Sequence, residues 1–124
     1  MRSAARAAVL ILSASVAPAL AHHPGSHAAR DADGGVRLEV VVTAADACTS
    51  IAQVRPGAPP GIAAVPGSAP VTARLQRPGG ACAAVVTAVR AEERLDLGRE
   101  VGQILLYVVG PDGAVASTER VPVR

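Results

Sequence analysis

Apolar and polar residues alternate with a period of two along much of the chain after residue 35. The clearest case is segment 36–43, in which valine or leucine occupies every second position from Val36 to Val42. This alternation predicts a β-strand with one buried face. The same pattern predicts a strand over 71–76. A last strand is expected over 115–123, after the turn signal Pro111-Asp112-Gly113, and its polar residues and Pro122 are typical of an edge strand.

Four further segments are expected to form strands on other grounds. Segment 104–109 is apolar at every position, which predicts a strand buried on both faces. Segment 81–90 carries alanine and valine on both faces and predicts a central strand, and a short strand is expected over 51–54. For segment 91–97 a strand is favoured because leucines alternate with Asp96, although the adjacent glutamates would also suit the first turn of a helix.

Segment 55–70 differs from these in its content of proline and glycine. Its sequence is RPGAPPGIAAVPGSAP, which excludes a long helix and any central strand. We therefore expect a long loop, with 62–65 as an optional short edge strand. Long loops in compact domains are often functional, and the alternative is a low-complexity excursion in a chain rich in Ala, Gly, Pro and Arg.

Six or seven short strands within residues 36–124 predict an all-β domain, a small immunoglobulin-like β-sandwich. The chain has 124 residues and no Phe or Trp, so Val, Leu, Ile and Ala must form its core. The tryptophan that packs on the disulfide of a true immunoglobulin domain is missing. The prediction therefore concerns the architecture and not the family.

Residues 1–21 are typical of a signal peptide. Arg2 and Arg6 precede an apolar run over 7–17, and Pro18 is followed by the cleavage motif Ala19-Leu20-Ala21. The run is shorter than the roughly 20 residues of a spanning helix. We therefore predict cleavage, a periplasmic or secreted protein and no membrane span afterwards, and an uncleaved anchor is the alternative.

The chain has two cysteines, Cys48 and Cys82. In an exported protein the default expectation for such a pair is a disulfide. A thiolate metal site or a reactive thiol is the alternative, but neither cysteine has a second cysteine or a histidine beside it. The disulfide is therefore the prediction.

Charge argues against a nucleic-acid partner. The chain has 12 basic residues, all arginine, against 10 acidic ones, and two of the arginines lie in the predicted signal peptide. The mature chain is then balanced, and Tyr107 is the single aromatic residue on which a base could stack. An envelope protein, whose identity the sequence does not give, is the partner we expect.

Chemistry-bearing side chains gather at the start of the mature chain. All three histidines, His22, His23 and His27, lie within the polar leader 22–35, which we expect to be flexible or loosely docked. The domain after the leader has no histidine and no lysine, so the usual general bases and amine nucleophiles are missing. The sequence therefore predicts a non-catalytic binding or interaction module in the cell envelope.

The alternative function is copper binding or delivery. Cleavage after Ala21 would expose the α-amine of His22, which can chelate a metal together with its own imidazole and a ring from His23 or His27. Such a nitrogen-rich set suits Cu(II), and no other cofactor is expected. A histidine-first, exported β-sandwich of this size resembles in general plan the periplasmic copper carriers of the CopC type, which implies a role in copper delivery. The resemblance covers the cleavage site and the size, and no internal histidine or ligand motif matches.

Overall fold

The computed structural model of the protein describes residues 25–124, and within this range it is all-β, with seven strands in two sheets and no helix. The strands are β1 (His27–Arg30), β2 (Val36–Ala44), β3 (Ser50–Pro56), β4 (Ser68–Gln76), β5 (Thr87–Leu95), β6 (Gln103–Val109) and β7 (Val115–Pro122). The predicted signal peptide, together with His22 and His23, lies outside the described residues.

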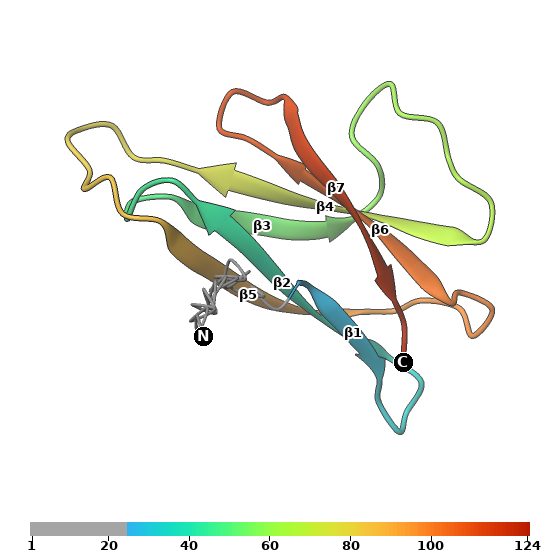
Figure 1. Ribbon diagram of the computed structural model, residues 1–124. Helices are drawn as coiled ribbons and strands as arrows, with labels where there is room; N and C mark the ends of the chain where they lie inside the picture. The colour runs from blue at the N-terminus through green and yellow to red at the C-terminus, as the bar shows by residue number, and fades with distance from the viewer. Residues whose placement is uncertain (1–24) are drawn as a thin grey trace, which may run out of the picture.

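The two sheets differ in size and in pairing. One sheet has the order β1-β2-β5, and both of its pairs are antiparallel. The other has the order β3-β4-β6-β7, in which β4 and β6 run parallel and the other pairs are antiparallel. Figure 1 shows the two sheets facing each other, with the chain crossing between them after β2, β4 and β5.

Both sheets contribute to a single apolar core. The smaller sheet supplies Leu38 among others, and the larger supplies Leu106, and neither side chain is exposed to solvent. The complete set of buried core residues is Ala28, Val36, Leu38, Val40, Val71, Ala73, Leu95, Ile104, Leu106, Val108 and Val121. Because these side chains come from alternate strand positions, the core follows directly from the period-two pattern.

The β1 and β7 margin of the domain is closed by backbone hydrogen bonds. Ala28 forms a parallel bridge with Val123, and Arg124 donates to the carbonyl of Ala28. The Arg30 amide in turn donates to the carbonyl of Arg124 over 2.8 Å. The end of the chain therefore ties the smaller sheet to the larger one.

Most of the predicted strands are confirmed. Segments 36–43, 51–54 and 71–76 lie in β2, β3 and β4, and segment 104–109 forms β6 with every position buried. Strand β7 lies at an edge of its sheet, as its polar residues predict. Segment 91–97 is strand rather than helix up to Leu95, where β5 ends.

Two predictions about the middle of the chain are wrong. Residues 81–86 are a loop rather than the first half of a strand, and β5, which begins at Thr87, is an edge strand and not a central one. Val85 and Val86 are 56% and 67% exposed, so the apolar run that predicted burial faces solvent instead. The optional edge strand over 62–65 is also absent, since these residues lie in a loop.

The described part of the predicted leader contains a strand. His27–Arg30 form β1, which pairs along its whole length with β2, from His27 beside Glu39 to Arg30 beside Val36. The strand is short and its apolar content is two alanines, so the sequence alone gives it no clear period. Residues 31–34 form a turn, in which the Gly34 amide donates to the Asp31 carbonyl over 3.0 Å.

In the usual immunoglobulin pattern both sheets are antiparallel. Here β4 and β6 form a parallel pair, so the larger sheet differs from that pattern. The finer, immunoglobulin-like classification therefore stays a prediction. Over residues 25–124 the structure has no helix with the length and apolar content needed to cross a membrane.

Candidate functional site

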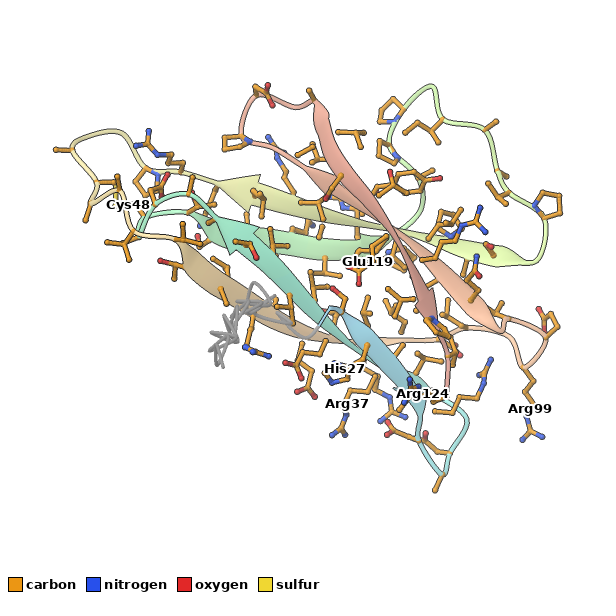
Figure 2. All side chains as sticks on the ribbon, in the orientation of Figure 1. His27, Arg37, Cys48, Arg99, Glu119 and Arg124 are labelled. Atoms are coloured by element: carbon orange, nitrogen blue, oxygen red, sulfur yellow. A yellow bond between two sulfur atoms is a disulfide. The ribbon has the colours of Figure 1, made fainter. Side chains whose placement is uncertain are left out.

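Of the three predicted metal ligands, the structure describes His27. This residue begins β1, and its side chain is 60% exposed. Figure 2 shows His27 at the start of β1. Its Nε2 lies 3.2 Å from Oε2 of Glu39, the residue that pairs with it on β2. Within residues 25–124 no three His, Cys, Asp or Glu side chains are grouped closely enough to hold a metal ion. One imidazole and one carboxylate therefore remain as candidate ligands from the described part.

The predicted disulfide is confirmed. Cys48 and Cys82 are bonded, their Cα atoms 5.8 Å apart, and 34 positions separate them in the sequence. The bond connects the loop before β3 with the loop before β5, so it links the two sheets at one end of the molecule. Both cysteines are consumed, which removes them from any thiolate site.

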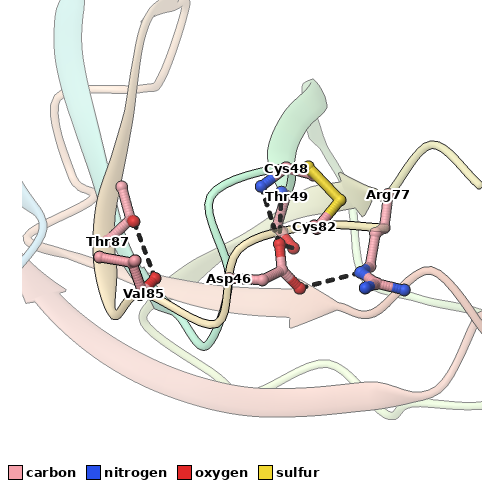
Figure 3. Close-up of polar contacts among 7 residues, drawn as sticks. All are labelled: Asp46, Cys48, Thr49, Arg77, Cys82, Val85 and Thr87. Atoms are coloured by element: carbon pink, nitrogen blue, oxygen red, sulfur yellow. Dashed lines mark hydrogen bonds and ion pairs between the residues drawn. A yellow bond between two sulfur atoms is a disulfide. The ribbon is translucent and has the colours of Figure 1, made fainter. Parts of the chain in front are cut away.

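Asp46 organises the loop beside this disulfide (Figure 3). Its Oδ1 accepts hydrogen bonds from the Thr49 hydroxyl and from the amides of Cys48 and Thr49, at 2.8 to 2.9 Å. Its Oδ2 accepts a hydrogen bond from Nε of Arg77 over 2.9 Å. The Thr49 hydroxyl, and after it the Cys48 amide, lower the pKa of Asp46 because they stabilise the charged carboxylate. Asp46 therefore holds the loop beside the disulfide in place.

The outer face of the smaller sheet carries charges that pair with one another. Arg90 donates to Glu39 over 2.8 Å, and Nε of Arg37 lies 3.2 Å from Glu92. Arg94 hydrogen-bonds Asp33, and this bond lowers the pKa of Asp33 and raises that of Arg94. A depression of about 570 Å³ beside Arg94 is lined by this paired Arg94 and Asp33, and by Asp96 and Arg99, which form no ion pair among residues 25–124.

The outer face of the larger sheet is different. Strand register places Arg55 beside Thr72 and Gln53 beside Arg74, and it places Arg120 beside Leu105. No outward-facing strand position on this side is acidic. Neither Arg55 nor Arg74 forms an ion pair with any residue between 25 and 124, and the one hydrogen bond of Arg55 goes to Oε1 of Gln53.

These two arginines line a groove beneath the start of the proline-rich loop. The groove has a volume of about 430 Å³. Strand residues form its floor, and residues from 56–60 and Gly113 form its walls. Its lining consists of Gln53, Arg55, Pro56, Gly57, Ala58, Pro59, Pro60, Thr72, Arg74, Val109 and Gly113. The groove therefore combines guanidinium groups with apolar proline rings.

Hydrogen bonds fix the start of the loop over the sheet. The Gly57 amide donates to the Pro70 carbonyl, and the Gly57 carbonyl accepts from the Thr72 hydroxyl, both over 2.8 Å. Gly57 has a φ of 113°, a conformation that an L side chain rarely adopts, so this turn requires glycine. Prolines at 56, 59 and 60 restrict the neighbouring backbone, so the groove wall is largely preorganised.

The prolines of 55–70 predict the loop, but no local pattern predicts which strand residues form the floor of the groove. The alternation in 71–76 already placed Thr72 and Arg74 on one face of a strand, which was the available signal. What it lacked was the partner strand: β4 lies beside β6, a parallel neighbour that begins 27 positions after β4 ends. Val109 of β6 reaches the groove only through that pairing.

Comparison with known proteins gives no relative: no protein-family model matches the chain, and no significant match was found among curated proteins or solved structures.

Proposed function

We propose that the protein is an exported, non-catalytic binding module of the cell envelope, built on an immunoglobulin-like sandwich, and that the groove beneath the proline-rich loop is its contact surface. The observation that carries this proposal is the pair of arginines, Arg55 and Arg74, which line the groove without an acidic partner among residues 25–124. Export rests on the predicted signal peptide 1–21, and the non-catalytic character rests on the absence of histidine and lysine after residue 27.

The chemistry of the groove favours an acidic, extended segment of another protein. Guanidinium groups bind carboxylates by paired, charge-assisted hydrogen bonds. On the smaller sheet Arg37, Arg90 and Arg94 are paired with acidic residues, as Arg90 is with Glu39 and Arg94 with Asp33. The arginines of the groove have donors left for a partner, and the proline rings offer apolar surface to the partner's backbone.

A binding titration tests this proposal. The mature protein is titrated with a short fluorescent peptide of alternating Asp and Ser, and with the same peptide carrying Asn in place of Asp. We expect the Asp peptide to bind more tightly, and we expect the double variant R55E/R74E to weaken its binding by about tenfold or more. Added salt should weaken the interaction of the wild-type protein.

The matched control is R37E/R99E, which changes the net charge equally but lies outside the groove lining. This variant should bind the Asp peptide within about twofold of the wild type, since distant surface charges contribute little. Equal weakening by both double variants would show that net charge alone attracts the peptide, and the groove would lose its role. Equal binding of the Asp and Asn peptides would overturn the acidic partner.

A second candidate function is Cu(II) binding, which the position of His27 favours. The imidazole is exposed, and the Glu39 carboxylate 3.2 Å away offers an oxygen ligand beside it. With the predicted α-amine and ring of His22, and the ring of His23, these groups would form a mixed nitrogen and oxygen set that suits Cu(II).

Visible absorption during a Cu(II) titration tests this second candidate. The mature protein with a native His22 terminus should develop a copper absorption band at one equivalent. A variant with Gly placed before His22, and the variant His27→Ala, should each weaken binding. Unchanged binding in the Gly-extended protein would exclude the chelating terminus, and the result is independent of the peptide titration.

A further inference from the structure

The open edge of the smaller sheet offers a second binding surface. Strand β5 spans nine residues and pairs with β2 on one side, and among residues 25–124 no strand lies on its other side. Apart from the β2 ladder, its backbone forms no hydrogen bond with the rest of the described chain. An edge strand presents free amide and carbonyl groups at alternate residues, which makes it a template for another strand.

The other edge strands are better protected than β5. Strand β7 ends in Pro122, and its pairing with β6 shifts register between Val108 and Val109. Strand β1 is short and bridges to the end of the chain beyond β7, and β3 contains a bulge between Ile51 and Gln53 and ends in Pro56. Strand β5 is regularly paired with β2 and contains no proline. Glu93 is the one charged residue on the inward face of β5, and such a charge opposes the addition of another strand at this edge.

The charges of β5 are complementary to themselves. If two copies pair antiparallel about a twofold axis at Ala91, then Arg90 of one copy faces Glu92 of the other, and the same pair occurs twice. A register centred on Arg90, Glu92 or Glu93 instead sets a like charge opposite itself. The register centred on Ala91 also places Glu93 opposite Val89, so no like charges meet.

This register would extend a ladder of charges that already exists in one copy. Arg90 contacts Glu39, and Glu92 contacts Arg37, across the pair of β2 and β5. Joining two copies would produce the alternating row Arg37, Glu92, Arg90 and Glu39, in which the last two come from the second copy. We propose that the protein forms a homodimer through antiparallel pairing of β5 with β5 in this register.

Charge reversal and mixing test the proposal with the mature, disulfide-bonded protein. Sedimentation should show a concentration-dependent dimer. The variant R90E places Glu opposite Glu twice, and E92R places Arg opposite Arg twice, so each alone should raise the dimer dissociation constant by about thirtyfold. An equimolar mixture of R90E and E92R should dimerise again, because both pairs between positions 90 and 92 in the mixed dimer are then of opposite charge.

The controls separate this effect from loss of folding. R99E and E100R carry the same charge changes outside β5 and should leave the dimer unchanged. Circular dichroism should show that R90E and E92R are folded, and recovery in the mixture itself requires folded chains. A wild-type protein that stays monomeric at millimolar concentration, or a mixture that stays monomeric, would overturn the proposal. The outcome does not depend on the groove, which lies on the other sheet.

Discussion

The outer faces of the two sheets use the same residue type in opposite ways. On the smaller sheet arginine is paired with acid, as Arg90 is with Glu39. On the larger sheet Arg55 and Arg74 face outward beside threonine and glutamine, with no acid on the strands around them. The inner faces do not differ in this way, because both contribute aliphatic side chains to one core.

This contrast shows where binding chemistry can be separated from folding chemistry. A charge that is paired within the domain contributes modestly to stability and keeps fewer free hydrogen-bond donors for an acidic ligand. A charge that the fold leaves without a partner costs little in water and retains its full capacity for hydrogen bonding. The face with spare donors is therefore the better candidate for recognition.

The largest predicted effect should be common to both sheets. Replacing both cysteines by serine removes the link between the loops before β3 and β5. On the chain-entropy model a closed loop of this length stabilises the fold by about 4 kcal/mol. Thermal unfolding of the double variant should show this loss, and hydrogen exchange should increase in β2 and β6 together. Faster exchange confined to one sheet would show that the two do not share a cooperative core.

A smaller loss in the free energy of unfolding is expected for an arginine that stabilises the fold, and none for one that does not. The guanidinium of Arg30 donates to the carbonyls of Gly34, Leu97, Gly98 and Val101 at 2.7 to 3.3 Å. Its loss leaves these carbonyls to water, so Arg30→Ala should reduce the free energy of unfolding by about 1–2 kcal/mol.

The matched variant is Arg74→Ala, an exposed arginine without an ion pair in the described domain. It should change the free energy of unfolding by less than about 0.5 kcal/mol, as measured by urea denaturation. A loss at Arg74 as large as that at Arg30 would mean that the groove arginine is a structural residue, and the contrast between the two faces would fail.

The smallest effect concerns acid stability. Hydrogen bonds lower the pKa of Asp46 in the folded protein. Its charged carboxylate therefore stabilises the fold at pH values above the ordinary pKa of aspartate, and this stabilisation is lost as the pH falls through the lowered pKa. Asp46→Asn should therefore lower the Tm at neutral pH, and the difference from the wild type should narrow below about pH 4. A difference that is constant down to pH 2 would contradict the assignment.

The control for this pH series is Asp96→Asn, whose carboxylate forms no hydrogen bond with residues 25–124. Its Tm should follow that of the wild-type protein at each pH, so the narrowing seen for Asp46 can be attributed to the bonds from Thr49 and Cys48.

Much of the fold could be predicted from the sequence because local pattern and burial agree in β2, β4 and β6. The start of β5 could not, since Val85 and Val86 have the composition of core residues, and it is the loop between the disulfide and β5 that exposes them. Strand β1 escaped prediction because its main support is the partner strand rather than its own apolar residues.

The candidate groove was only half predictable for a related reason. The loop 55–70 is evident from its prolines, and the alternation in β4 gives the face of Arg74. Their proximity depends on hydrogen bonds from Gly57 and on the parallel pairing of β4 with β6, which no local pattern specifies. Copper binding, export and the identity of the partner stay predictions.

The central claim is that spare arginine donors, and not charge in general, make the larger sheet the recognition face. Amide NMR of the labelled mature protein during titration with the Asp and Ser peptide tests it most directly. We predict that shifts concentrate at Gly57, Thr72 and Arg74 and leave β2 unchanged. Shifts that gather on the outer face of the smaller sheet, or that spread evenly over all arginines, would contradict the account.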